Sequence, residues 1–366
     1  MRVGFYSPLP PARTGVADYS AALLKALRRH GEIEIAPRYS DVNLYHLGNN
    51  QIHRPIYDRA LAKPGVVVLH DAVLQHFFLG SLTEERYVEE FAFNYGEWRQ
   101  SLARELWRNR ASSGLNAKYF EYPMLKRIAR ASHAVVVHNA AAAELVRAHA
   151  PRARVVEIPH LVEPVEMPDA AEILRFRAGL RIAPGAFLFG VFGYLRESKR
   201  VIAILRRFEK LHRDLPKTAL LIAGQFVSPD LARAAAPMLR LPGVARTGHL
   251  NTREFLLAAA SVDACINLRY PSVAETSGIA VRLMGMGKPV MLTGGLENAA
   301  YPETACFRIE SGIAEESALA EFMMLTAVFP EVAREVGRQA ARYIRECHAP
   351  ERVAERYWET LCLSRD

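Results

Sequence analysis

The chain has 366 residues, of which half are hydrophobic and 23% are charged. This composition is typical of a soluble globular protein, and the length suits two α/β domains of about 150 to 200 residues each. No apolar run approaches the roughly 20 residues that span a bilayer. Because the first residues lead directly into a strand-like run, with no signal peptide before it, we expect a cytoplasmic protein.

The net charge of +8 is a mild excess, spread along the chain as scattered arginines. It favours anionic partners, but no nucleic-acid-binding motif accompanies it, so we expect no nucleic-acid partner. The cysteines lack C-x-x-C spacing and predict neither a zinc site nor a disulfide framework. They are Cys265, Cys306, Cys347 and Cys362.

Strand and helix signals alternate in the first half of the chain. This order predicts a parallel sheet with helices on both faces. The predicted strands are residues 3–6, 66–69 and 134–138, and the predicted helices are residues 17–30 and 140–148.

Residues 84–131 form a long, mostly helical stretch that is rich in aromatic side chains and arginines. The part from Trp98 to Arg130 would suit a peripheral contact with an anionic membrane, at its inner face, where it would meet a lipid-linked acceptor. The pattern favours the ordinary alternative, which is the core and solvated face of amphipathic helices.

Three prolines and little periodicity mark residues 158–168 as a linker between two domains. A second strand and helix series follows, and the chain ends in a predicted helix over residues 349–363. We therefore expect an N-terminal Rossmann-like domain over residues 1–163 and a C-terminal Rossmann-like domain over residues 164–345. Residues 346–366 are expected to form a helix that packs back on the first domain.

The most informative stretch runs from Glu275 to Val290. It predicts a strand over residues 262–268, a polar loop, a helix that begins near Ser277 and a second strand over residues 289–292. This order places helix N-terminal amides beside the Glu275 carboxylate at the C-terminal end of a parallel strand. Such a corner is where open α/β sheets bind phosphate-bearing ligands.

The loop after the first strand carries Thr14, Gly15 and Asp18 at the start of a predicted helix. Gly15 would let a ligand approach the backbone, and the helix N-terminus favours anionic groups. The loop contains neither G-x-G-x-x-G nor G-x-x-x-x-G-K-[ST], which counts against a dinucleotide-binding fold or a P-loop. An ordinary proline-rich connection is the alternative.

Polar residues follow other predicted strands. His70 and Asp71 come directly after the strand over residues 66–69, where an imidazole or carboxylate can serve as acid, base or ligand contact. A capped strand end is the alternative. Asn49 and Asn50 are suited to bind hydroxyl groups, although Gly-Asn-Asn is also an ordinary turn.

A basic loop, Gly193 to Arg200, follows the strand over residues 187–192. Arg196 and Lys199 in this loop are placed to neutralise a diphosphate, because the loop lies at a strand end; a solvated loop is the alternative. Residues Gly248, His249 and Leu250 close another strand, and Asn251 with Glu254 forms a capping pattern for the next helix.

Together, these elements resemble the retaining glycosyltransferases of the GT-B fold, family 4, in a bacterial branch with a Glu-Thr-Ser-Gly variant of the donor-site motif. The resemblance rests on Pro11 to Gly15, His70-Asp71, the G-x₅-K element from Gly193 to Lys199 and the corner from Glu275 to Val290. It implies two Rossmann-like parallel-sheet domains that face a central cleft.

The resemblance also implies roles for individual residues. Glu275 would bind hydroxyls of the donor sugar, the amides of Thr276, Ser277 and Gly278 would hold the diphosphate, and Lys199 would stabilise the leaving phosphate. Glu275, Lys199, His70 and Asp71 are the expected catalytic residues. The expected donor-binding set adds Gly15, Gly193, Arg196, Gly248, His249, Leu250 and Arg282, and the expected acceptor side is Thr14, Asp18, Asn49, Asn50 and His70.

The sequence departs from the family pattern at two positions. Leu283 stands where a second Glu would bind ribose, and Tyr194 stands where an Arg would follow the loop glycine. Arg282 or Arg196 would then supply positive charge to the diphosphate.

The function that we expect is transfer of a sugar from a nucleoside-diphosphate sugar, UDP- or GDP-linked, to an acceptor hydroxyl with retention of configuration. The absence of Asp-x-Asp from the sequence favours a mechanism without a metal ion. The acceptor would be a sugar, glycan or lipid-linked molecule, in bacterial polysaccharide, glycolipid or glycoconjugate synthesis. A nucleotide-sugar epimerase and a non-catalytic nucleotide-sugar-binding subunit are the alternatives.

Overall fold

The computed structural model describes residues 1–12 and 14–364, and its chain divides into two compact units. The first unit comprises residues 1–163, 271–276 and 347–366, and the second comprises residues 164–270 and 277–346. Residues 13, 365 and 366, which belong to the predicted first loop and the predicted C-terminal segment, lie outside the described residues.

The first unit is built on a six-stranded parallel sheet in the order β2-β1-β3-β4-β5-β6. Its strands are β1 Arg2–Tyr6, β2 Glu32–Ile35, β3 Val42–Leu47, β4 Val66–Leu69, β5 Ala134–Val137 and β6 Val155–Glu157. Its helices are α1 Gly15–Leu27, α2 Arg54–Ala62, α3 Gln75–Ser81, α4 Glu84–Tyr95, α5 Gln100–Arg108, α6 Lys126–Ala131, α7 Ala140–His149 and α15 Pro350–Cys362.

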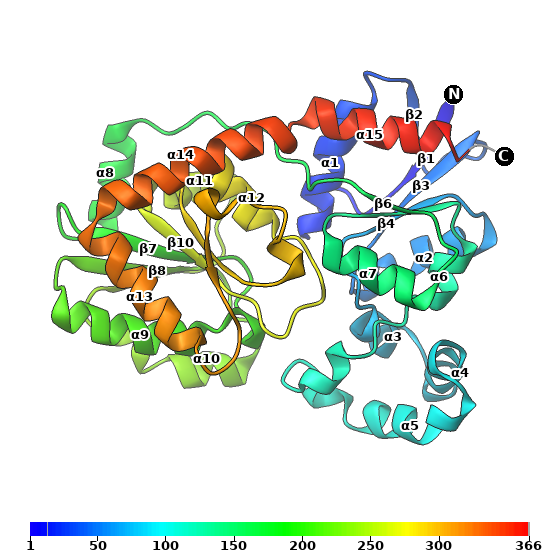
Figure 1. Ribbon diagram of the computed structural model, residues 1–366, viewed down its shortest axis with the longest axis horizontal. Coiled ribbons are helices and arrows are strands. Elements are labelled where there is room, and N and C mark those ends of the chain that lie inside the picture. The colour runs from blue at the N-terminus through cyan, green and yellow to red at the C-terminus, as the bar shows by residue number, and fades with distance from the viewer. Residues whose placement is uncertain (13, 365–366) are drawn as a thin grey trace. The chain divides into compact units, whose positions relative to one another are not determined.

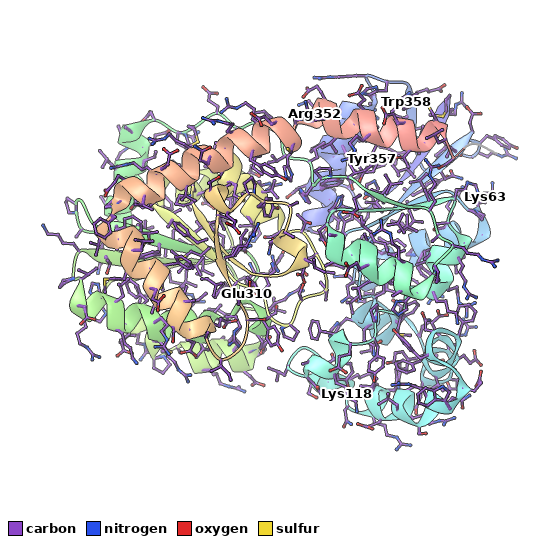
Figure 2. The ribbon with its side chains drawn as sticks, in the orientation of Figure 1. Lys63, Lys118, Glu310, Arg352, Tyr357 and Trp358 are labelled. Atoms are coloured by element: carbon purple, nitrogen blue, oxygen red, sulfur yellow. The ribbon has the colours of Figure 1, made fainter. Side chains whose placement is uncertain are left out.

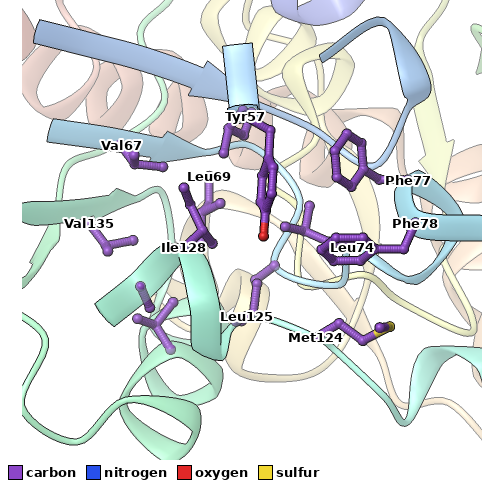
Figure 3. Packing of buried hydrophobic residues seen from close by; sticks show 14 of the residues in the cluster. Tyr57, Val67, Leu69, Leu74, Phe77, Phe78, Met124, Leu125, Ile128 and Val135 are labelled. Carbon is purple, nitrogen blue, oxygen red and sulfur yellow. The ribbon is translucent and has the colours of Figure 1, made fainter. Parts of the chain in front are cut away.

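Alternating side chains of this sheet enter two different apolar cores, as the two-residue period of a strand requires. Val66 and Val68 of β4 belong to the core under α1 and α15, whereas Val67 and Leu69 belong to the core on the opposite face. Figure 3 shows this second core, in which Tyr57 from α2 packs among strand and loop side chains. Burial on both faces explains why β4 and β5 are uninterrupted runs of apolar residues.

The C-terminal helix α15 returns to the first unit, as the sequence predicts. In Figure 1 it is the red helix next to α1, and the two helices are in contact. The Tyr19 and Tyr357 hydroxyls are 2.9 Å apart in the buried interface between them. Figure 2 labels Tyr357 and its neighbour Trp358 on this helix. Trp358 fills the space beside Gly31, where a Cβ atom would lie 2.2 Å from its ring.

The second unit has a six-stranded parallel sheet in the order β12-β11-β10-β7-β8-β9. Its strands are β7 Phe187–Phe192, β8 Thr218–Ala223, β9 Val244–Thr247, β10 Ala264–Asn267, β11 Val290–Thr293 and β12 Phe307–Ile309. Its helices are α8 Ala170–Gly179, α9 Val201–Asp214, α10 Pro229–Ala235, α11 Thr252–Ser261, α12 Gly278–Gly285, α13 Glu315–Val328 and α14 Pro330–Cys347.

Two parallel sheets, each with flanking helices, confirm the predicted α/β fold. The predicted capping pattern at α11 is also present, since Asn251 and Glu254 exchange side-chain and backbone hydrogen bonds. Among the described residues, no helix has both the length and the apolar character needed to cross a membrane. In both sheets the strands run parallel, so all their carboxyl ends meet at one edge.

Candidate active site

In the first unit, four neighbouring strands end in candidate site residues. The order β1-β3-β4-β5 brings Thr14 and Gly15, Asn49, and His70 and Asp71 to successive positions along the carboxyl edge of the sheet. The next position belongs to His138, which follows β5 as His70 follows β4. His138 was not predicted as a site residue, although its place at the end of an apolar strand is the signal that identified His70.

The side chains of Thr14, Asn49 and Asn50 all make hydrogen bonds within the first unit. Thr14 Oγ1 accepts a hydrogen bond from the Ala17 amide and caps α1, and Asn50 Oδ1 accepts one from the Ile52 amide. Asn49 Oδ1 accepts from the Phe77 amide at 2.8 Å, and its Nδ2 lies 3.2 Å from His76 Nδ1. Asn49 therefore joins the end of β3 to α3.

Asp71 fixes the loop beside it, because its Oδ2 accepts a hydrogen bond from the Asn49 amide at 2.7 Å. Gly48 lies between Asp71 and His53: a Cβ atom there would be 3.1 Å from Asp71 Oδ2 and 3.0 Å from His53 Nε2. Gly15, in contrast, has open space where a side chain would begin, because no atom of the described residues would lie within 4 Å of a Cβ atom added there. The approach of a ligand to the Gly15 backbone stays a prediction, and this open space is compatible with it.

Four histidines and a tyrosine form a continuous aromatic group, which we call the histidine cluster: Tyr19, His46, His70, His138 and His160. The ring centroids of Tyr19 lie 4.7 to 6.1 Å from those of the four imidazoles. His46 Nδ1 and His70 Nε2 are 3.0 Å apart. His138 Nδ1 donates a hydrogen bond to the Ile158 carbonyl at 2.9 Å.

Three histidines of the cluster, His46, His70 and His138, are neutral at pH 7. Burial is the main cause, because desolvation disfavours the charged form, and the neighbouring histidines add to it. Burial lowers the pKa of His46 and of His70 well below the usual range, and it lowers the pKa of His138 to about 4. His53, whose Nδ1 donates to the His46 carbonyl, also has its pKa lowered by burial to about 4.

The segment that contains Glu275 is attached to this same edge of the first sheet. The Ala72 amide donates a hydrogen bond to the Val273 carbonyl, and Asn139 Nδ2 donates to the Ala274 carbonyl and to Thr276 Oγ1. Ala274 has a φ of +54°, which a residue with a side chain rarely adopts. Strained backbone of this kind is common at functional sites. The structure thus brings Glu275 and Thr276 together with His70 and Asp71.

In the second unit, the carboxyl edge of the sheet gathers positive charge around the N-terminus of α12. Lys199 is 6% exposed, its Nζ donates to the Phe192 carbonyl, and it lies against Gly193 at the end of β7. Gly193 has a φ of +90°, and a Cβ atom on it would lie 2.5 Å from Ile279. This positive φ and the contact with Ile279 favour glycine at this position.

Arg269 joins this edge from the neighbouring strand β10. Its amide donates to Thr293 Oγ1 at 2.8 Å, and its Nη2 donates to Ser277 Oγ at 3.3 Å. Ser277 caps α12, because the same Oγ accepts a hydrogen bond from the Ala280 amide. A hydrogen bond between Tyr270 and Ser198 connects the loops that carry Arg269 and Lys199.

We call Lys199, Arg269 and the N-terminus of α12 the cationic edge. A helix N-terminus carries about half a positive charge, so a guanidinium held beside it adds to a positive potential that favours the binding of an anion. Asn267, two residues before Arg269, is 6% exposed, and its Nδ2 has no hydrogen-bond partner among the described residues. Arg269 was not predicted as a site residue.

The remaining predicted donor residues are distributed along the same sheet. Arg196 is exposed in the loop after β7, and Arg282 lies one turn into α12. Gly248, His249 and Leu250 follow β9, two strands away from β7 in the sheet order. Arg200, the last cation of the predicted basic loop, forms an ion pair with the buried Glu315, with Nε and Oε1 2.6 Å apart. Arg200 therefore has a structural role.

Comparisons with known proteins identify the fold. No model of a known protein family matches the sequence, and no curated protein matches it. The structure is similar to that of Alr3699/HepE from Anabaena in complex with UDP and glucose, with a TM-score of 0.70, 13% sequence identity and 99% of each chain covered.

Two further similar structures extend over nearly the whole chain. Sucrose-phosphate synthase from Thermosynechococcus elongatus gives a TM-score of 0.68 at 14% identity and covers 98% of each chain. WaaG, a glycosyltransferase involved in lipopolysaccharide biosynthesis, gives a TM-score of 0.63 at 15% identity, over 96% of this chain and 98% of its own. These neighbours have the GT-B fold, and the likeness shows that this chain has it too.

Proposed function

We propose that this protein is a glycosyltransferase that takes a sugar from a nucleoside-diphosphate sugar. The observation that carries the proposal is the cationic edge, where Lys199, Arg269 and the N-terminus of α12 lie at the carboxyl end of one parallel sheet. A diphosphate supplies negative charge that complements this arrangement. The full-length likeness to HepE, whose structures contain UDP and UDP-glucose, supports a nucleotide sugar as the donor.

Side chains and backbone amides would do the work that a divalent cation does in other transferases. Lys199, Arg269 and the amides of Thr276, Ser277 and Gly278 would stabilise the negative charge that develops on the departing phosphate. Among the described residues, no group of three or more His, Cys, Asp or Glu side chains is arranged to hold a metal ion. Because these side chains and amides can stabilise the charge of the diphosphate, we propose a metal-independent reaction, with a UDP- or GDP-sugar as donor.

We further propose that configuration is retained and that the protein resembles family 4 in mechanism. Glu275 would bind hydroxyls of the donor sugar, since the strained Ala274 and the hydrogen bonds from Asn139 fix its backbone. The leaving phosphate would accept the proton of the acceptor hydroxyl. Retention is tested by assigning the anomeric configuration of the product by NMR; an inverted product would refute it.

The transferase activity is tested by incubating the protein with UDP-, GDP- and dTDP-sugars, with and without a panel of sugar and lipid-linked acceptors. We expect release of the nucleoside diphosphate that depends on the acceptor. A Lys199→Gln variant should lose about 10- to 100-fold in kcat/KM, because a charge-assisted contact is removed. Lys210→Gln, on the exposed face of α9, is the matched control and should not change it.

The same incubation separates the alternatives. Epimerisation of the donor sugar in the absence of an acceptor would show that the protein is an epimerase. A donor that binds but is never consumed with any acceptor would show a binding subunit.

A further inference from the structure

Some hydrogen bonds of the histidine cluster determine which ring nitrogen of a histidine carries the proton. A backbone carbonyl can only accept a hydrogen bond, so the His138 nitrogen facing the Ile158 carbonyl must be Nδ1–H. In a neutral imidazole the other nitrogen is then an acceptor. His138 Nε2 is this acceptor, and it has no hydrogen-bond partner among the described residues.

The contact between His46 and His70 allows two arrangements, and burial distinguishes them. If His70 Nε2–H donated to His46 Nδ1, the neutral His46 would carry its own proton on Nε2. That nitrogen is buried and has no partner in the described structure, so an N–H donor would be left unsatisfied. Buried unsatisfied N–H groups are rarer in proteins than buried unsatisfied acceptors. His46 Nδ1–H therefore donates, and His70 Nε2 accepts.

The same reasoning gives the state of the second nitrogen of His70. With Nε2 as acceptor and the ring neutral, the proton is on Nδ1. His70 is partly exposed, so this N–H can donate to a ligand. The ring centroids of His70 and His138 are 5.1 Å apart at the ends of adjacent strands. His70 thus offers a donor, which suits an oxygen acceptor such as a hydroxyl group, whereas the acceptor nitrogen of His138 is buried.

We propose that His46 is a positioning residue: its Nδ1–H holds His70 with the proton on Nδ1, so that His70 can donate a hydrogen bond to a hydroxyl group of the substrate. The proposal rests on the proposed function only for the identity of the ligand, a polyhydroxylated molecule. It assigns His70 to substrate binding, in place of the catalytic acid or base role that the sequence suggests.

The test is a ¹H–¹⁵N spectrum of histidine-labelled protein, which distinguishes the two neutral tautomers of each ring and needs no substrate. The chain has 12 histidines, and the signals of His70 and His138 are assigned from their absence in His70→Gln and His138→Gln variants. At pH 7.5 we expect both rings to carry the proton on Nδ1. A proton on Nε2 of His70 would overturn the proposal.

Variants of His46 test the positioning role. His46→Leu removes the donor, so His70 should shift toward the Nε2–H tautomer that a free neutral imidazole prefers. His46→Asn keeps a donor and should preserve the wild-type signals. His30→Leu, at an exposed position of the same unit, is the control and should leave His70 unchanged. An unchanged His70 tautomer in His46→Leu would refute the role of His46; if that variant does not fold, the wild-type and His46→Asn spectra still decide.

The transferase assay supplies an independent measure. His46→Leu should raise KM for the ligand about 2- to 10-fold, which is the usual effect of losing one hydrogen bond, and kcat should change less than KM. His46→Asn should return KM to the wild-type value. An equal fall in kcat in both variants would instead indicate general damage to the fold. If no substrate is turned over by the wild type, the proposed function fails, whereas the spectra still test the tautomers.

Discussion

Single residues at the strand ends carry most of the proposed chemistry, and two of them lie outside the apolar cores. Gly15 begins α1 and has open space where a Cβ atom would lie, so nothing in the described structure requires a glycine there. Arg269 donates to Ser277 at the cap of α12, so its variant is measured against a matched control.

Gly15→Ala should keep or slightly raise stability, by up to about 1 kcal/mol, because alanine favours the helix. It should lower kcat/KM about 10- to 100-fold if the added methyl group displaces a substrate from the backbone. The measurements are thermal unfolding and the transfer assay on one preparation. Full activity in this variant would show that no ligand approaches Gly15.

Arg269→Met should reduce the rise in melting temperature that UDP or GDP produces, because a ligand stabilises only in proportion to its affinity for the native state. The expected loss of affinity is about 10- to 100-fold. Arg233→Met, at an exposed arginine of α10 in the same unit, is the matched control. An equal thermal shift in the Arg269 and Arg233 variants would remove Arg269 from the site.

At the scale of elements, the corner between α12 and β11 depends on a close approach of two backbones. Gly287 has a φ of +75°. A Cβ atom on Gly337 of α14 would lie 2.0 Å from the carbonyl oxygen of Gly287. Lys288 Nζ donates to the Ala260 and Val262 carbonyls at the end of α11. The Gly-Lys-Pro-Val run that follows the donor motif therefore has a structural role, which is to join α11, α14 and β11.

Gly337→Ala should destabilise the second unit by about 1 to 3 kcal/mol or more, because the new methyl group meets backbone and the packing must shift. Gly179→Ala is the control: it ends α8, and a Cβ atom added there would have no atom of the described residues within 4 Å, so the change should be neutral or slightly stabilising. Calorimetric unfolding of the two variants checks this. Equal stabilities would show that α14 moves away from Gly287 at little cost.

Polar residues that directly follow an apolar strand were predictable from the sequence. Polar residues inside a strand, which interrupt its apolar pattern, were not. Val66 to Leu69 is wholly apolar, so His70 was clearly a strand-end residue. In β3, Asn43 and His46 interrupt the apolar pattern, although every residue of that strand is buried. Buried polar residues give no periodic signal, because their partners come from distant parts of the chain. His46 was missed for this reason.

In the second sheet, one of the two cations of the cationic edge was predicted from the sequence and the other was not. Lys199 was predicted from its place after β7, whereas no role was predicted for Arg269. Its function depends on the contact with Ser277, eight residues later, which only the folded loop creates. Sequence spacing identified the helix N-terminus, and the structure added the cation beside it.

At the scale of the whole molecule, the buried histidines should make stability depend on acid. An unfolded histidine binds a proton below about pH 6.5, whereas His53 and His138 in the folded chain do so only near pH 4. The unfolded state therefore gains protons first, and stability falls as pH decreases from 6.5 toward 4. For the buried His53 the loss is about 3 kcal/mol across this range.

This fall can be followed in the first unit alone. The three tryptophans, Trp98, Trp107 and Trp358, all belong to that unit, so their fluorescence during urea unfolding reports on it. We expect a lower urea midpoint at pH 5 than at pH 7.5, and a weaker pH dependence in His53→Gln than in the exposed-site control His30→Gln. A midpoint that is constant from pH 7.5 to pH 5 would contradict the neutral state of the buried histidines.

The central claim is that the cationic edge binds the diphosphate of a nucleotide sugar. Isothermal titration calorimetry of the wild-type protein with UDP, GDP and dTDP tests it most directly. We predict saturable one-to-one binding of UDP or GDP, weakened about 10- to 100-fold by Lys199→Gln and unaffected by Lys210→Gln. No binding of any of the three nucleotides, or equal affinity in both variants, would contradict the account.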